Sequence, residues 1–356
     1  MGMSARREGA PVSLRRGLAS LPRAVWVLDA GLFVNSFGTF LPVFIVLYLV
    51  RAGYPPPVAA LGLSAYGLGA LLGPALGGYL ADRLGRRDTI AAGMAVAAAA
   101  VVAVPLAHAL PIIAALVALS AAGSGAAAPA GAALVGDLGY AAGPAAAGVL
   151  AGHAFPLLFA GDAATSLAFG AIVLLRLPRD RPAAPPARAR GGFLRAARRD
   201  GTVVRLLAAV LAIHLVYWQQ LATLPLVVTG RGLPAAAYGL LLSVNGLVVI
   251  LCELPLTAVT RRLAPRRAIA LGFLLIGAGF ALLAAAGTLA ALVACVLVWT
   301  LGEMIWDPVA SAYLATLAPP HLRGRYQGAF SATVASAYVV APALGGALYA
   351  RSPVAL

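Results

Sequence analysis

The chain has 356 residues, of which 62% are hydrophobic and 10% are charged, and its mean hydropathy is +0.94. A water-soluble domain of this composition could not cover its apolar surface with polar groups. Apolar runs of about 18 residues or more recur along the chain, which predicts an all-α polytopic membrane protein. The solid Ala, Leu, Val and Gly blocks exclude a β-barrel, whose strands alternate apolar and polar residues.

The net charge of +15 would suit a nucleic-acid-binding protein, but the positions of the basic residues predict a different role. All 26 basic residues are arginine. Only Arg51, Arg231 and Arg351 lie outside five groups, at 1–23, 83–87, 176–205, 261–267 and 323–325. If membrane spans separate these groups, the groups share one side of the bilayer, as the positive-inside rule requires. We therefore expect a lipid bilayer as partner and no nucleic acid, with the N-terminus cytoplasmic and the chain in the plasma (inner) membrane.

The apolar segments predict about eleven transmembrane helices. In chain order they lie near 24–50, 57–81, 89–107, 110–135, 139–152, 154–176, 203–229, 236–259, 267–286, 288–316 and 327–350. The fifth segment has about 14 residues, so as a helix it would be roughly 21 Å long, against a hydrocarbon core of ~30 Å. We predict a short, strained fifth span with almost no loop before it.

The spans form two halves that are joined by a linker rich in Pro, Ala and Arg at 177–202. The predicted domains are a basic cytoplasmic tail at 1–23, an N-terminal helix bundle at 24–176 and an incomplete C-terminal helix bundle at 203–356. Similar segments recur at corresponding places in the halves, which predicts bundles related by a pseudo-two-fold axis. Internal repetition at half-length is typical of secondary carriers, whose substrate site lies between the halves.

The two halves differ in length between matching positions. We align Leu138 with Leu317 and Pro144 with Pro342. Leu317 and Pro342 are 25 positions apart, whereas Leu138 and Pro144 are 6 positions apart. About nineteen residues of the second half therefore have no counterpart in the first. The second half also has no counterpart of the sixth span. The sequence therefore resembles a twelve-span carrier that lacks part of span five and span twelve.

A charged motif follows the second span, in "GGYLADRLGRRDTI" at 77–90. The motif resembles the signature of the loop between spans two and three in the major facilitator superfamily. The resemblance implies a two-bundle transporter fold and a conformational latch that holds the halves together in one state, formed by Gly78, Asp82, Arg83, Gly85, Arg86 and Arg87. Gly77 and Gly78 lack side-chain bulk, so we expect a close helix contact there. The alternative is that the arginines only anchor the loop to the cytoplasmic face.

A second motif lies in the fifth span. Gly143, Pro144 and Gly148 resemble a reduced form of the glycine-proline motif of drug/proton antiporters. The resemblance implies a helix-packing role for these residues and membership of the drug:proton antiporter (multidrug efflux) branch. One feature departs from that branch, because its members often carry an arginine in the fourth span and residues 110–135 contain no basic residue.

Carboxylates inside predicted spans indicate candidate functional residues, because inserting a charge at the centre of a span into the bilayer costs about 2.5–3.5 kcal/mol. Glu303 and Asp307 lie four residues apart on one helix face, so their charges repel and the pair favours a proton or a cation. Asp29 lies one to two turns into the first span. We predict these three as proton-coupling residues. The alternatives are that Glu303 is hydrogen-bonded for structure and that Asp307 lies near the cytoplasmic boundary.

Polar and aromatic residues in other spans predict a cavity for an amphipathic small molecule. His214, Trp218 and Gln219 share one stripe of the seventh span, and Asn35 and Asn245 lie in the first and eighth spans. The alternative is that these side chains only pack against neighbouring helices. The sequence contains no Walker loop and no His/Cys cluster, so we expect no cofactor, no metal and no enzymatic activity.

These observations predict a secondary active transporter that moves a small organic solute by alternating access. The expected variant is proton-coupled efflux of a drug or metabolite by a monomer. The alternatives are an uptake carrier for a sugar or metabolite and a non-transporting remnant of such a carrier.

Overall fold

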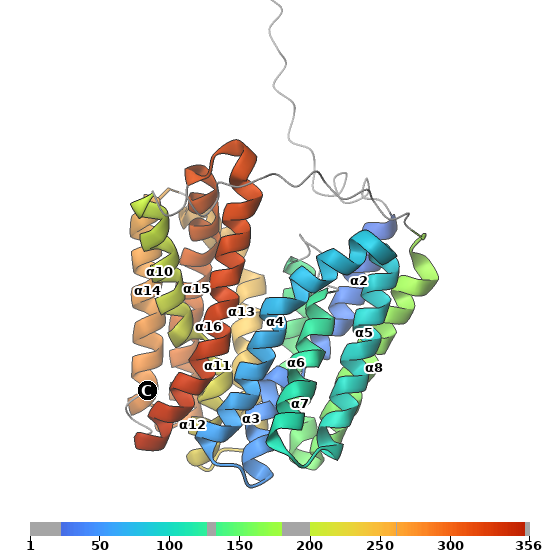
Figure 1. Ribbon diagram of the computed structural model, residues 1–356. Coiled ribbons are helices and arrows are strands. Elements are labelled where there is room, and N and C mark those ends of the chain that lie inside the picture. The colour runs from blue at the N-terminus through green and yellow to red at the C-terminus, as the bar shows by residue number, and fades with distance from the viewer. Residues whose placement is uncertain (1–22, 127–132, 180–199, 261, 353–356) are drawn as a thin grey trace, which may run out of the picture.

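The computed structural model describes residues 23–126, 133–179, 200–260 and 262–352. These residues form two bundles of helices that lie side by side, and no strand occurs among them (Figure 1). The predicted all-α polytopic fold is therefore confirmed. Among the described residues, nine helical segments are long and apolar enough to cross a membrane, and α6 is a shorter apolar helix of 17 residues.

Each bundle is built from a consecutive part of the chain. The first contains α2 (Arg23–Phe37), α3 (Leu41–Arg51), α4 (Pro56–Leu84), α5 (Arg86–Ala103), α6 (Leu110–Ala126), α7 (Ala133–His153) and α8 (Phe155–Arg176). The second contains α10 (Gly201–Tyr217), α11 (Gln219–Ala222), α12 (Leu224–Gly230), α13 (Ala235–Thr260), α14 (Pro265–Leu282), α15 (Leu289–Leu317) and α16 (Arg323–Arg351).

The fourth and fifth spans divide the chain differently from the prediction. α6 ends at Ala126 instead of near residue 135, and α7 begins at Ala133, so α7 has 21 residues instead of about 14. At 1.5 Å per residue this helix is about 31 Å long, which is enough to cross a bilayer. The prediction of a short fifth span was wrong, because α7 begins before residue 139, where the prediction placed its start. Both helices are shorter than α15 and α16, which have 29 residues each.

The first span of each bundle is interrupted. α2 and α3 are separated by Gly38–Phe40, and α10, α11 and α12 are separated by Trp218 and Thr223. At the first interruption, the carboxylate of Asp162 on α8 accepts hydrogen bonds from the backbone N–H groups of Phe40, at 3.0 Å, and Leu41, at 2.9 Å. The sixth span thus supplies the cap that the new helix start needs.

Small residues bring the two bundles into close contact, chiefly α4 against α16 and α7 against α13. A Cβ atom at Gly67 would lie 2.6 Å from the backbone of Tyr338 on α16. A Cβ atom at Gly239 on α13 would overlap the carbonyl oxygen of Pro144 on α7. Only glycine permits these helix separations, because any larger residue would push the backbones apart.

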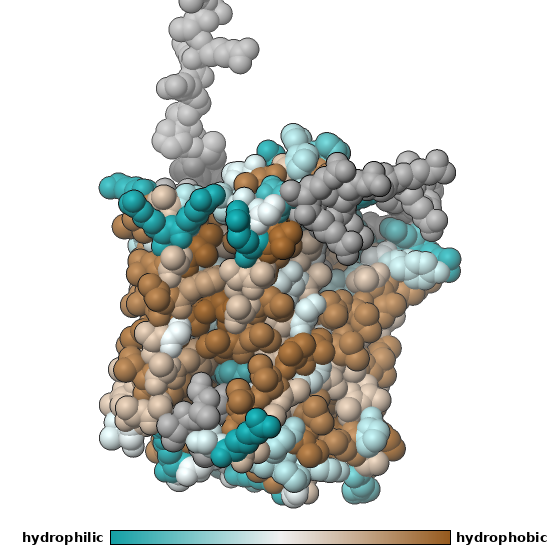
Figure 2. All heavy atoms as spheres, turned by 60° about the vertical axis from the view of Figure 1, so that its left-hand side comes forward, coloured by the Kyte–Doolittle hydropathy of each residue, from teal (hydrophilic) through white to brown (hydrophobic). Residues whose placement is uncertain are grey.

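The bundles approach each other more closely at one end than at the other. α3 contacts α11 and α12, and these helices lie at the end where the two ribbons converge (Figure 1). At the opposite end, where α4 leads into α5, the ribbons of the two bundles are splayed apart. Hydrophobic side chains cover the middle of the face that contains α10 and α14, with hydrophilic residues at its ends (Figure 2). Such a band matches the lipid-facing surface of a membrane protein.

Candidate functional site: a central cavity between the bundles

Two cavities lie between the bundles, and they meet at shared residues. Both are lined by Tyr217, Trp218, Glu303 and Tyr338. The first, of about 970 Å³, is further lined by Ala70, His214, Trp306, Asp307, Phe330, Ser331, Val334 and Ala335. The second, of about 820 Å³, is further lined by Thr39, Pro42, Tyr66, Tyr140, Gln220, Leu221, Asn245, Gly246 and Val249. We treat the two cavities together as the central site.

Glu303 is held at the junction by two neutral donors. The hydroxyl of Tyr217 donates to Glu303 Oε1 at 2.5 Å, and Asn245 Nδ2 donates to Glu303 Oε2 at 3.0 Å. Asn245 Nδ2 also lies 2.9 Å from Thr300 Oγ1, which orients the amide. None of the described residues that line the central site is arginine, although the chain contains 26.

Aromatic rings form much of the wall around Glu303. The Trp218 and Tyr338 rings are stacked, with centroids 4.0 Å apart and planes at 8°. The Tyr66 ring of the N-terminal bundle lies 5.7 Å from the Tyr338 ring, and the rings of His214 and Trp306 meet edge to face at 5.3 Å. The faces of aromatic rings carry partial negative charge, so they attract cations. The central site therefore combines apolar surface with negative potential.

The structure brings five of the sequence-predicted residues together at this site: His214, Trp218, Asn245, Glu303 and Asp307. The tyrosines and Gln220 were missed, because an isolated tyrosine in an apolar helix shows no spacing pattern. A search for every hydroxyl-bearing ring inside a predicted span would have found the tyrosines.

Three other candidates lie elsewhere: Asn35 and Gln219, which were predicted to line the cavity, and Asp29, which was predicted to couple protons. Asn35 faces α8, where its Oδ1 lies 3.4 Å from Ser166 Oγ. Gln219 Nε2 donates to the carbonyls of Leu215, at 2.9 Å, and Ala341, at 2.8 Å, so this amide ties α11 to α10 and α16. Asp29 is half-buried in α2 and lines neither cavity. The interruption of the seventh span rotates Gln219 away from the stripe that a continuous helix would form.

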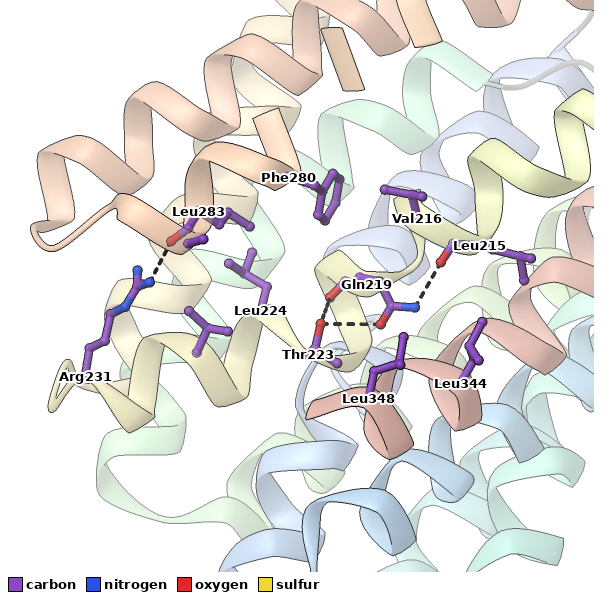
Figure 3. Close-up of a pocket in the computed structure, with 12 residues that line it drawn as sticks. Leu215, Val216, Gln219, Thr223, Leu224, Arg231, Phe280, Leu283, Leu344 and Leu348 are labelled. Carbon is purple, nitrogen blue, oxygen red and sulfur yellow. Dashed lines mark hydrogen bonds between the residues drawn. The ribbon is translucent and has the colours of Figure 1, made fainter. Parts of the chain in front are cut away.

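Gln219 instead lines a separate pocket of about 780 Å³ in the C-terminal bundle (Figure 3). Most of its wall consists of leucines and other apolar residues from α10, α12, α14 and α16. Thr223 Oγ1 donates to Gln219 Oε1 at 3.3 Å, and Arg231 at one end of the pocket donates to the carbonyl of Leu283 at 2.6 Å. The polar groups of this pocket therefore form hydrogen bonds with other groups of the C-terminal bundle.

The predicted latch residues lie where α4 leads into α5. Gly85, with φ +87°, connects the two helices in a conformation that favours glycine. Arg87 donates to the carbonyl of Leu174 on α8 at 2.6 Å, and the Arg83 guanidinium lies 4.3 Å from the ring centroid of Tyr79. Asp82 and Arg86 are exposed, and within the described part of the chain Asp82 has no hydrogen-bond or ion-pair partner.

The two glycines of the motif differ in their surroundings. A Cβ atom at Gly77 would lie 2.5 Å from the Cα atom of Ala126, so Gly77 permits the close contact of α4 with α6. Gly78 faces open space, which corrects the expectation that it also packs closely. In the fifth span, Gly143 contacts the backbone of Phe37 on α2, and a Cβ atom at Gly148 would lie 2.9 Å from the Cα atom of Ala236 on α13.

Two repeated helical bundles around a cavity within the membrane-spanning region define the class of secondary transporters. The sequence profile of the Major Facilitator Superfamily matches residues 28–138 and 136–342. The chain therefore belongs to the Major Facilitator Superfamily, and it is a multi-pass membrane transporter rather than an enzyme.

Sequence relatives carry the same family description. The chain is 25% identical over 352 residues to the uncharacterized MFS-type transporter YttB of Bacillus subtilis (strain 168), covering 92% of this chain and 89% of the relative. It is 28% identical over 128 residues to the uncharacterized MFS-type transporter YqjV of the same organism, covering 36% of this chain and 30% of that protein.

Solved structures of transporters share the fold. The nucleoside transporter NupG matches with a TM-score of 0.75 at 15% identity, over 91% of this chain and 90% of that chain. A POT family transporter in complex with a thioalcohol-conjugated peptide matches with a TM-score of 0.74 at 15% identity, over 95% and 93%. A D-xylose-proton symporter matches with a TM-score of 0.66 at 15% identity, over 91% and 89%. At these identities the likeness concerns the fold alone.

Proposed function

We propose that this chain is a proton-coupled carrier that exports small organic cations by alternating access, as a monomer in the plasma (inner) membrane with its N-terminus cytoplasmic. The observation that carries the proposal is the position of Glu303 where the two cavities meet, in a lining whose described residues include aromatic rings and no arginine. An anionic substrate would find no partner charge there. A cation would find a carboxylate and several ring faces.

Glu303 is the proposed point of exchange between proton and substrate. A carboxyl group can hold a proton or pair with a cation, but not both, because protonation removes its charge. Tyr217 and Asn245 are neutral donors, so they keep the side chain in place in the ionised state without supplying a competing positive charge. Asp307, one helical turn away in the first cavity, adds negative potential along the path to Glu303.

The proposed transport cycle rocks the bundles about their close contacts. We take the splayed end as the cytoplasmic end, since the arginine-rich connections between helices lie there. Binding at Glu303 would then occur from the cytoplasm, and closure of that end would bring the latch residues Asp82, Arg83, Arg86 and Arg87 against the opposite bundle. The exposed position of Asp82 suits the open state of such a latch.

Two ions of equal shape and opposite charge test the proposal. Purified protein in liposomes should accumulate tetraphenylphosphonium when a proton gradient is imposed, and should not accumulate tetraphenylborate. Glu303→Gln keeps the size of the side chain but removes its charge. It should weaken tetraphenylphosphonium binding at least about tenfold and abolish proton-driven accumulation.

The matched control is Asp29→Asn, which neutralises a carboxylate on a span but outside the central site, and it should retain accumulation. Equal accumulation of both ions would refute the assignment of substrate charge. Absence of gradient-driven movement of any tested solute in the folded protein would favour the non-transporting alternative, and accumulation in Glu303→Gln would remove Glu303 from the mechanism.

A further inference from the structure

The separate pocket of the C-terminal bundle lies where the N-terminal bundle has a helix. In the N-terminal bundle, α8 packs against α5, α2 and α3, and the rings of Phe155 and Phe159 on α8 lie 5.9 and 4.9 Å from the ring of Tyr48 on α3. In chain order α14, α10 and α12 correspond to α5, α2 and α3, and among the described residues no helix corresponds to α8. The pocket of about 780 Å³ is lined by these same three helices together with α11 and α16 (Figure 3).

The pocket is accessible from the lipid-facing side of the bundle. α10 and α14 lie on the side of the C-terminal bundle that is remote from the N-terminal bundle (Figure 1), and hydrophobic side chains cover the middle of that face (Figure 2). Leu344 and Ala284, which line the pocket, are exposed. None of the described residues that line the pocket also lines the central site. A membrane lipid can therefore reach the pocket without entering the transport path.

The middle of the pocket offers no free polar group to an occupant. Five of its lining residues follow one another at four-residue intervals: Leu215, Gln219, Thr223, Val227 and Arg231. The Gln219 amide donates to two backbone carbonyls, and its Oε1 atom accepts from Thr223. The polar atoms of this stretch are thus satisfied within the protein, and an occupant meets mainly apolar surface.

Arg231 supplies a cationic group at one end of the pocket (Figure 3). It is exposed, and its guanidinium donates to the carbonyl of Leu283 at 2.6 Å. A guanidinium carries five N–H donors, and among the described residues no carboxylate pairs with this one. In the N-terminal bundle the guanidinium of Arg51, which ends α3, lies 4.8 Å from the ring centroid of Phe155 on α8. Arg231 is therefore placed to bind an anionic group such as a phosphate.

We propose that this pocket is a binding site for an anionic phospholipid, with the phosphate at Arg231 and one acyl chain along the apolar wall. An empty pocket would forfeit the dispersion contacts of its lining, which an acyl chain restores. A span-length helix about 10 Å across and 30 Å long would need more than about 2,000 Å³, so the pocket suits a chain better than a helix. The site is separate from the central site and does not depend on the proposed function.

Two lipids with the same acyl chains and different headgroups test the role of Arg231. Native mass spectrometry of the full chain in mild detergent measures the affinity for the first bound phosphatidylglycerol or phosphatidylcholine, whose choline neutralises the phosphate charge. The wild type should bind phosphatidylglycerol about fivefold more tightly, as one arginine near an anionic lipid predicts. Arg231→Gln should lose this preference and leave phosphatidylcholine binding within about twofold. Arg351→Gln, the matched control, removes an exposed arginine that does not line the pocket and should keep the preference.

A bulky residue inside the pocket tests the position of the acyl chain. Ala284→Trp fills space in the pocket and should weaken binding of both lipids at least about tenfold. Ala281→Trp adds the same side chain at an exposed position outside the pocket and should stay within about twofold of the wild type. Leu344→Trp provides a second variant inside the pocket if Ala284→Trp does not give a single monodisperse species.

The remaining outcomes overturn the inference. A wild type without the headgroup preference, or an Arg231→Gln variant that keeps it, would remove Arg231 from lipid binding. Unchanged affinity in both pocket variants would place the lipid elsewhere. A wild-type dimer that Ala284→Trp converts to monomers would assign the pocket to a second copy of the chain. Displacement of phosphatidylglycerol by equimolar oleate would assign it to a free fatty acid.

Discussion

At the scale of single residues, Asp162 shows that a carboxylate within a span can have a structural partner that lies far away in the sequence. Its neighbours in sequence are apolar or small, and no acid or base lies nearby to suggest a role. In the folded chain it caps the start of α3, 121 positions away, through the N–H groups of Phe40 and Leu41. This contact sets where the first span is interrupted and so where Thr39 and Pro42 enter the central site.

The cap predicts a graded effect of substitutions at Asp162. Asp162→Ala leaves two N–H groups without an acceptor and should lower the free energy of unfolding by about 2 kcal/mol. Asp162→Asn keeps a carbonyl oxygen in the same place and should lose less. The difference would be measured as thermal stability in detergent. The loss of the monodisperse peak in size-exclusion chromatography after heating reports unfolding. Equal losses in the two variants would show that the charge, not the hydrogen bonds, supplies the stability.

At the scale of helices, α7 has one face of small residues toward α2 and another toward α13. Gly143 meets the backbone of Phe37 on α2, whereas Gly148 meets Ala236 on α13, and Gly239 on α13 meets Pro144. The first contact lies within a bundle and the others lie between bundles. The glycine-proline motif therefore occupies a surface along which the bundles would move relative to each other in the proposed transport cycle.

This arrangement predicts different consequences for two glycine substitutions. Gly239→Val would place side-chain atoms against the carbonyl of Pro144 and should reduce transport at least about tenfold, because overpacking a close helix contact forces the backbones apart. Gly152→Val adds the same side chain on α7 where a Cβ atom meets nothing within 4 Å, so transport should stay within about twofold. Similar losses in both variants would indicate a general intolerance of valine instead of a requirement for close contact.

At the scale of the whole molecule, the distribution of arginine predicts which end faces the cytoplasm. Ala52 lies after α3 at the end where the bundles converge, and Ala264 lies before α14 at the opposite end. Both residues are exposed. The positive-inside rule places Ala264, among Arg262, Arg266 and Arg267, on the cytoplasmic side.

Cysteine labelling would measure this orientation. In a background without Cys252 and Cys295, a membrane-impermeant maleimide added to intact cells should label Ala52→Cys and should not label Ala264→Cys. Permeabilised cells, in which both positions should react, provide the control. Labelling of Ala264→Cys alone in intact cells would reverse the orientation and, with it, the direction proposed for transport.

The class of the protein could be predicted from the sequence, because the features that indicate it lie within short stretches of the chain. The length of an apolar run, the side on which arginines gather and a ten-residue motif can all be found without knowing which helices touch. Helix boundaries were less certain at the fourth and fifth spans, since a continuous Ala- and Gly-rich run carries no signal for where one helix ends. The alignment of the halves predicted a gap before Pro144, but it carried no signal for where α6 ends and α7 begins.

The composition of the site was decided by tertiary structure. Tyr217 and Glu303 are 86 positions apart, and their hydrogen bond exists only because α10 packs beside α15. Gln219 and Gln220 are chemically identical and adjacent, yet the Gln219 amide is hydrogen-bonded within its bundle, whereas Gln220 lines the central site. Hydropathy and charge along the chain determined that this protein spans a bilayer in two related halves. The interruptions of the first and seventh spans, which turn individual side chains by fractions of a helical turn, decided which polar groups meet at the cavity.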